Sequence, residues 1–219
     1  EEKKITKSSF SGKAKLAIVI DDVTTQTQFD KIQNVGFPIT MAFLPPTSAH
    51  KKSALIAQEL RTYMVHLPLE ATSKRAEEEN TLHVGDGIET IEARIKELKT
   101  LYPKALYYNN HTGSKFTEDN QSMDRLMQVM KQNNLIFVDS RTSPKSVVKK
   151  YASKYQVRYI GRNVFLDNTP SVPYIKGQLQ KAVDIAKSSG SAIAIGHPYG
   201  ATIEALRESK EILEGIDIV

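Results

Sequence analysis

Short apolar stretches rich in β-branched residues alternate with longer amphipathic segments along this chain. The apolar stretches predict strands over residues 16–20, 39–44, 63–67, 105–108, 135–138, 157–160 and 192–195. Apolar residues recur at helical spacing over residues 26–35, 48–61, 88–101, 119–133, 144–154, 172–189 and 200–213. Strands that alternate with helices indicate parallel pairing through right-handed crossovers. The pattern therefore predicts an α/β fold.

This alternation is expected to fill one domain. Seven strand–helix units could close as a small barrel or lie open as a doubly wound sheet, and the pattern alone does not choose between them. No Gly-rich linker or change of composition divides residues 15–219, whereas residues 1–14 are polar and predict a flexible arm. The stretch 71–87 has no obvious core residues, which indicates a surface loop or a lid over the strand ends.

Side chains with acid–base and ligand chemistry gather at the carboxyl ends of the predicted strands, where parallel folds place functional groups. These ends read Asp21-Asp22, His66-Leu67-Pro68-Leu69-Glu70, Asn109-Asn110-His111-Thr112-Gly113-Ser114, Asp139-Ser140-Arg141-Thr142-Ser143 and Gly196-His197-Pro198. Three of the five histidines lie there, while His50 and His83 lie at a helix start and in the stretch 71–87.

Each of these motifs also has an ordinary structural interpretation. Asp21-Asp22 and Asn109-Asn110 could be turn residues, since Asp and Asn favour turns. His66 could be a core histidine bonded to a carbonyl, and Glu70 could be a solvated acid at a helix start. His197 could be structural. Taken together, however, two adjacent carboxylates and three histidines at one end of a sheet indicate a set of metal ligands and acid–base groups.

The composition narrows the chemistry of such a set. The chain has no cysteine, which excludes disulfides, thiolate zinc sites, iron–sulfur clusters and a cysteine nucleophile. A site of nitrogen and oxygen ligands admits Zn, Co, Mn, Fe or Ni. One Asp and two His would hold a divalent ion with an open position, which activates water and polarises a carbonyl. A second Asp as base and a His that protonates the leaving group would complete an amide or ester hydrolase.

The net charge says less about function than the absence of cysteine does. The 30 Lys and Arg residues exceed the 25 Asp and Glu residues, which gives a net charge of +5, but the lysines are scattered among acidic residues. This favours a solvated mixed-charge surface over nucleic-acid binding and also suits an anionic envelope polymer. The longest aliphatic run, residues 16–20, is too short to cross a membrane, so we expect no transmembrane segment in this chain. Because the chain starts at Glu1 without Met, an anchor upstream is an expectation.

The strand-end motifs, together with the block Arg162-Asn163-Val164-Phe165-Leu166-Asp167-Asn168, resemble the divergent polysaccharide deacetylase family. That family is a distant branch of the NodB-type carbohydrate esterases, and the resemblance covers residues 15 to 207. It implies an irregular (β/α)7 barrel of the NodB or glycoside hydrolase–deacetylase type, formed by residues 15–219.

The resemblance also implies residue roles. Asp21 matches the base, His197 the acid, and Asp22 and His66 two metal ligands. Where the parent families have a second His, this sequence has Glu70, so His111 could supply the missing imidazole and Glu70 could be a ligand or an outer partner of one. The remaining implied positions are Asp139, near that of an Asp that tunes the acid, and Asn110 and Arg141, which could contact substrate.

The function implied is metal-dependent deacetylation of N-acetylated sugars in an envelope polysaccharide or peptidoglycan. Zn²⁺ is the first choice of metal, with Co²⁺, Mn²⁺ or Ni²⁺ as alternatives, and the expected location is periplasmic or extracytoplasmic. A second hypothesis is a catalytically inactive glycan-binding or envelope-scaffold module that keeps the same pocket. A third is a metal-dependent hydrolase of another amide or ester.

Overall fold

A computed structural model describes residues 12–73 and 77–219. Its parallel strands form one curled sheet in the order β6-β5-β4-β3-β2-β1-β8-β7, with β9 beside the start of β1. The strands are β1 (Lys15–Val23), β2 (Thr40–Phe43), β3 (Met64–Leu69), β4 (Tyr107–Thr112), β5 (Ile136–Asp139), β6 (Ile160–Gly161), β7 (Val164–Phe165), β8 (Ser191–Gly196) and β9 (Asp217–Ile218). The predicted arm over residues 1–14 falls largely outside the described residues.

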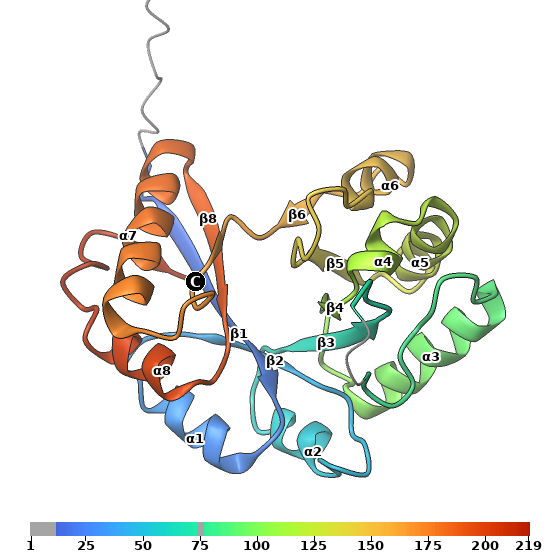
Figure 1. The fold of residues 1–219 in the computed structure, drawn as a ribbon, viewed down its shortest axis with the longest axis horizontal. Helices are drawn as coiled ribbons and strands as arrows, with labels where there is room; N and C mark the ends of the chain where they lie inside the picture. The colour runs from blue at the N-terminus through green and yellow to red at the C-terminus, as the bar shows by residue number, and fades with distance from the viewer. Residues whose placement is uncertain (1–11, 74–76) are drawn as a thin grey trace, which may run out of the picture.

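Helices lie outside the curled sheet (Figure 1). They are α1 (Gln26–Gln33), α2 (Ser53–Ala57), α3 (Ile88–Leu101), α4 (Ser114–Glu118), α5 (Asn120–Gln132), α6 (Val148–Lys154), α7 (Val172–Ser189) and α8 (Gly200–Arg207). The outermost strands in the sheet order, β6 and β7, follow each other in sequence but do not pair. The sheet therefore curls into a barrel that stays open on one side, which confirms the (β/α) barrel and excludes the flat doubly wound sheet.

Six of the seven predicted strands are present with shifted boundaries, whereas the predicted strand 157–160 overlaps β6 only at Ile160. The predicted helix 48–61 shortens to α2, which begins at Ser53 and whose N-cap residue, Lys52, makes no side-chain cap hydrogen bond. The predicted helix 119–133 is preceded by a separate short helix, α4, because Asp119 adopts an extended conformation and caps α5 by accepting from the Ser122 amide. Strands β7 and β9 have two residues each, which is too short for an apolar pattern to reveal.

Two apolar layers hold the barrel together. The larger layer lies between the sheet and the helices. A smaller cluster fills the inside of the curled sheet and contains Val19, Ala42, Met64, Val138 and Ile195. Successive strand residues point to opposite faces, so alternate residues of one strand contribute side chains to the two layers. In β1, Val19 points inward, whereas Ile18 and Ile20 pack toward the helices.

Within the loop over residues 71–87, the structure describes residues 71–73 and 77–87. One isolated bridge, between Leu69 and Leu82, joins it to the sheet, and the Glu70 amide donates to the Leu82 carbonyl. Its glutamates contact neighbouring loops, as in the pair between His50 Nε2 and Glu78 Oε2 at 3.1 Å. The described part of the loop thus lies at the carboxyl ends of the strands, where we placed a lid or surface loop.

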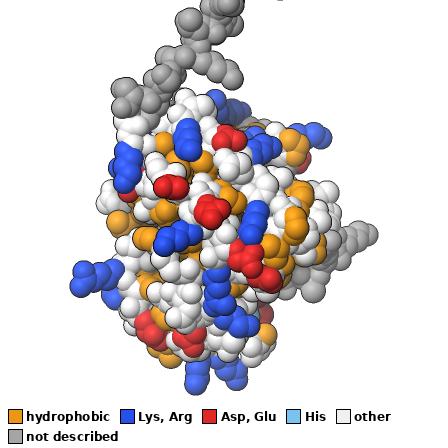
Figure 2. Space-filling view, turned by 90° about the vertical axis from the view of Figure 1, so that its left-hand side faces the viewer, with side chains coloured by type: hydrophobic (Ala, Val, Ile, Leu, Met, Phe, Trp, Pro, Cys, Tyr) orange, Lys and Arg blue, Asp and Glu red, His pale blue; other side chains and the backbone are white. Residues whose placement is uncertain are grey.

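The molecular surface carries both signs of charge. On the face shown in Figure 2, Lys and Arg side chains are interspersed with Asp and Glu side chains. No helix within residues 12–73 and 77–219 is sufficiently long and apolar to span a bilayer.

Gly113 is a position where the fold requires glycine. Its φ is +84°, and a Cβ atom there would lie 2.9 Å from the Cβ of Leu69, which is fully buried. We expect Gly113→Ala to lower the free energy of unfolding by about 2–4 kcal/mol, because a left-handed backbone and a steric overlap add together. Urea denaturation measures this loss.

Gly177 provides the matched control. It lies inside α7, and a Cβ atom there meets nothing within 4 Å. Gly177→Ala should raise stability by about 0.5–1 kcal/mol, since alanine favours a helix interior over glycine. Equal effects of the two substitutions would contradict the assignment.

Candidate active site

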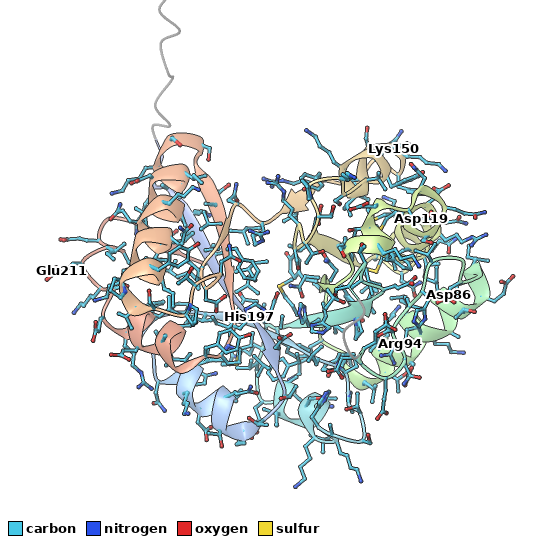
Figure 3. All side chains as sticks on the ribbon, viewed as in Figure 1. Asp86, Arg94, Asp119, Lys150, His197 and Glu211 are labelled. Atoms are coloured by element: carbon cyan, nitrogen blue, oxygen red, sulfur yellow. The ribbon has the colours of Figure 1, made fainter. Side chains whose placement is uncertain are left out.

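A polar layer lies directly above the inner apolar cluster. On most of the strands, the residue two positions beyond the apolar member lies on the same face and is polar, whereas on β2 it is Leu44. The layer contains Asp21 after Val19, His66 after Met64, Asn109 after Tyr107, Ser140 after Val138, Arg162 after Ile160 and His197 after Ile195. His197 accordingly lies near the middle of the molecule, whereas Arg94, Lys150 and Glu211 lie among the outer helices and loops (Figure 3).

A bulge in β1 brings both of its aspartates to this layer. The pairing of β1 with β2 shifts register between Ile20 and Val23, and Asp22 adopts a φ of +58°. A regular strand would point Asp21 and Asp22 to opposite faces. The extra residue and the left-handed backbone of Asp22 turn its carboxylate toward the histidines instead, since a β-bulge re-aims side chains.

Asp22, His66 and His111 form a compact cluster. Asp22 Oδ1 lies 2.9 Å from His111 Nδ1 and 3.2 Å from His66 Nε2. One ligand atom from each residue lies within 4.8 Å of the others. One carboxylate oxygen and two imidazole nitrogens are a donor set that Zn²⁺ accepts in catalytic sites with three protein ligands. The structure thus brings together the three residues that the sequence analysis proposed as ligands.

The charges in this cluster shift its pKa values. Burial opposes ionisation of Asp22, but the hydrogen bonds from His111 and His66 outweigh it and hold the pKa of Asp22 well below its usual range. Burial likewise opposes the charged form of His66, yet the carboxylates of Asp21 and Asp22 raise its pKa to about 9. The pKa of Asp21 is raised, mainly by burial.

Asn109 connects the cluster to Asp21, and we did not assign it a role from the sequence. Its Oδ1 lies 2.9 Å from His66 Nδ1, and its Nδ2 donates to Asp21 Oδ1 at 2.8 Å and to Ser140 Oγ at 3.2 Å. An amide oxygen only accepts, so Nδ1 of His66 donates a proton to Asn109, and Nε2 is the nitrogen that faces the cluster. Strand alternation could have identified Asn109, since it follows the inward Tyr107 by two residues.

His197 is held by Asp167. The ring nitrogen Nδ1 of His197 lies 3.0 Å from Asp167 Oδ1, and the His197 amide and the Thr202 hydroxyl both donate to Asp167 Oδ2. The free Nε2 faces the cluster, 3.8 Å from Asp22 Oδ2. Burial would lower the pKa of His197, but the bond to Asp167 and the nearby carboxylates raise it. The block 162–168 contains Asp167, and this was the sequence signal for it.

Asp139 requires a correction, because it does not contact His197. Its carboxylate accepts from the Arg141 amide at 2.8 Å, the Ser146 hydroxyl at 2.8 Å and the Tyr159 hydroxyl at 3.2 Å. Asp139 therefore orders the loop after β5, and the carboxylate that contacts His197 is that of Asp167.

Glu70 and Asn110 also lie apart from the metal cluster. Glu70 pairs with Lys115 Nζ at 2.5 Å and accepts from the Val84 amide at 2.8 Å, so it fastens the loop 77–87 and is neither a ligand nor a partner of one. Asn110 is buried and directs its side chain to the Thr112 carbonyl, the Thr142 hydroxyl and the Ser140 amide. Its amide is thus occupied inside the protein and has no group left for substrate.

Sequence comparisons identify relatives along nearly the whole chain. Residues 18–219 match the model of the divergent polysaccharide deacetylase family. An uncharacterized protein from Haemophilus influenzae is 35% identical over 97% of this chain and 77% of its own length. The Escherichia coli protein YibQ is 36% identical over 89% of this chain and 61% of its own length.

Solved structures share the fold at low sequence identity. An uncharacterized protein from Agrobacterium tumefaciens superposes with a TM-score of 0.81 at 20% identity, over 95% of this chain and 88% of that one. The catalytic domain of a peptidoglycan N-acetylglucosamine deacetylase from Eubacterium rectale gives 0.53 at 13% identity, over 96% and 89%. A CE4 family pseudoenzyme from Bacillus anthracis gives 0.54 at 12% identity, over 94% and 63%.

Proposed function

Because the chain belongs to the divergent polysaccharide deacetylase family, we propose that it is a metal-dependent enzyme that removes acetyl groups from N-acetylated sugars. The observation that carries this proposal is the cluster of Asp22, His66 and His111, with Asp21 and His197 on either side. The substrate is an envelope polysaccharide or peptidoglycan, and the location is extracytoplasmic. Both follow from the family rather than from a bound ligand.

The three cluster residues would hold Zn²⁺ or a similar divalent ion. When bound, such an ion lowers the pKa of water and polarises the acetyl carbonyl. Asn109 fixes the ring of His66 from behind, which keeps one of these ligands oriented.

Asp21 is positioned to accept the proton of the attacking water. Its Oδ1 is occupied by Asn109 Nδ2, whereas Oδ2 lies toward the cluster, 3.7 Å from His66 Nε2. The raised pKa of Asp21, which results mainly from burial, makes this carboxylate a stronger proton acceptor than a solvated one.

His197 is positioned to protonate the leaving amine. Asp167 keeps a proton on Nδ1, so the reactive position is Nε2, which faces the cluster. The ring of His197 is packed between Phe165 and Tyr199, with ring centroids at 5.3 Å on both sides, and this packing limits its rotation.

The direct test is acetate release. Purified protein with Zn²⁺ or Co²⁺ should release acetate from N-acetylglucosamine oligomers or from peptidoglycan, and a chelator should abolish the release. Tight metal binding without acetate from any of these substrates would contradict the proposal. A glycan-binding module would instead bind the oligomers without turnover. Hydrolysis of small acetyl esters alone would indicate a different esterase.

The Asp167–His197 pair predicts a change in the pH profile. Activity requires protonated His197, so the rate falls as pH rises through its pKa. Since the bond to Asp167 raises that pKa, Asp167→Asn should move the alkaline limb of kcat to lower pH. Asp139→Asn should leave the limb in place, because Asp139 does not touch His197. An unmoved limb in Asp167→Asn would show that another group is titrating.

A further inference from the structure

Two arginines, Arg141 after β5 and Arg162 after β6, lie next to each other, and nothing in the proposed chemistry uses them. Arg162 follows Ile160 by two residues and so belongs to the polar layer inside the barrel. Its Nε donates to the Ser140 carbonyl at 2.6 Å, and its Nη2 donates to the Arg141 carbonyl at 2.8 Å. The guanidinium is therefore fixed on the loop that follows β5.

The guanidinium of Arg162 also adjoins the candidate acid. It stacks over the ring of Phe165, 4.7 Å from the centroid, and the Phe165 ring lies 5.3 Å from that of His197. The ring of Phe165 would thus separate a group bound by Arg162 from His197, the proposed proton donor.

The positive charge at this place is not balanced by a direct partner. Across residues 12–73 and 77–219, neither Arg141 nor Arg162 has a carboxylate within 4.0 Å. Burial and the charge of Arg141 together lower the pKa of Arg162, so the two cations repel each other. The carboxylates of Asp139 and Asp21 offset this repulsion only in part, since the pKa of Arg162 remains lowered, and an anionic ligand would offset it further.

Hydrogen-bond donors remain for such a ligand. Two of the three guanidinium nitrogens of Arg162 are bonded to carbonyls, and Nη1 has no bond among the described residues. Arg141 is exposed, and among the described residues its side chain makes one hydrogen bond, of 3.4 Å, to the Arg162 carbonyl. One fixed and one adjustable guanidinium form a suitable pair for carboxylate or phosphate oxygens.

We propose that Arg141 and Arg162 bind an anionic group, a carboxylate or a phosphate, on the sugar next to the acetamido group that is cleaved. This inference rests on the proposed deacetylase function and narrows its substrate class to acidic glycans. Arg162 would fix the anionic group relative to His197, and Arg141 would close over it from the exposed side.

The test compares binding of matched oligosaccharides to the full chain. The Asp21→Asn protein with Zn²⁺ is titrated with three ligands. They are a neutral N-acetylglucosamine tetramer, an acidic tetramer in which N-acetylglucosamine alternates with glucuronic acid, and N-acetylglucosamine 1-phosphate. The acidic tetramer should bind at least about tenfold tighter than the neutral one, as expected for hydrogen bonds to a charged group. The phosphate compound shows whether phosphate substitutes for carboxylate.

Three variants locate the effect. Arg162→Gln and Arg141→Gln should each abolish the preference for the acidic tetramer and leave neutral binding within about twofold. Arg158→Gln is the control, because Arg158 is an exposed arginine that precedes the amino end of β6, whereas Arg162 follows its carboxyl end. Arg141→Gln also covers the case in which Arg162→Gln fails to fold, since the side chain of Arg141 is exposed.

The outcomes separate this inference from the deacetylase proposal. Equal affinity for acidic and neutral tetramers, or an equal loss in Arg158→Gln, would overturn the anion site. If the wild-type protein with Zn²⁺ releases acetate equally from both tetramers, the enzyme proposal stands and the anion site fails. If no acetate is released but the acidic tetramer binds through Arg141 and Arg162, the anion site stands alone.

Discussion

Asp21→Asn is expected to reduce kcat by about 10²–10⁴-fold while Zn²⁺ stays bound, because this substitution removes only the proton acceptor. Asparagine has nearly the size of aspartate, and its side-chain oxygen can still accept from Asn109 Nδ2 as Asp21 Oδ1 does. The proposed metal ligands are the side chains of Asp22, His66 and His111. Acetate release measured beside the zinc content of the same sample tests both halves of the expectation.

Asp184→Asn is the matched control for this substitution. Asp184 is an exposed residue of α7 whose carboxylate accepts only from Gln180, so kcat should not change. A kcat of Asp21→Asn above half of the wild-type value would remove Asp21 from the mechanism. Loss of zinc from Asp21→Asn would instead indicate that Asp21 is a ligand.

His66→Ala is expected to abolish activity by a different route, through loss of the metal. The affinity for Zn²⁺ should fall by more than about 10²-fold, because even the outer partners of metal ligands change affinity 10–100-fold. His66 is 2% exposed and contacts both aspartates of β1, so no other donor can take its place without rearrangement. Calorimetric titration with Zn²⁺ measures the loss.

Two further histidines make this experiment specific. His197→Ala should lose turnover but keep Zn²⁺, because its Nε2 lies beside the cluster without belonging to it. His83→Ala should keep both, since His83 pairs with Glu77 in the loop that precedes α3. Unchanged zinc affinity in His66→Ala would refute the assigned ligand set.

The sequence predicts the fold well because the strands alternate with helices and have apolar residues on both faces. It also predicts the cluster, since the carboxyl ends of parallel strands meet at one edge. It does not reveal the bulge in β1, because a left-handed residue such as Asp22 leaves no hydrophobic pattern. For the same reason the need for Gly113 and the start of α4 become clear only from the backbone.

The partners of the acid–base groups were harder to predict than the groups themselves. Asn109 and Asn110 are adjacent and chemically identical, and only the facing of β4 assigns one to His66 and the other to the loop after β5. Asp139 follows the predicted strand 135–138, and Asp167 lies in the block 162–168 that resembles the family. Which of them contacts His197 depends on the pairing of β7 with β8. Because β7 has only two residues, hydrophobic periodicity cannot detect it.

The left-handed residues at the ends of β1, β4 and β5 connect catalysis to the evolution of stability. Asp22, Thr112 and Arg141 have φ values of 58°, 52° and 52°. Such conformations cost roughly 1–2 kcal/mol per residue, so the edge of the barrel that carries the proposed active site weakens the fold that supports it. A descendant that no longer needs the chemistry can replace these residues and become more stable. Within such a family, the most heat-resistant members are therefore expected to include proteins that have abandoned catalysis.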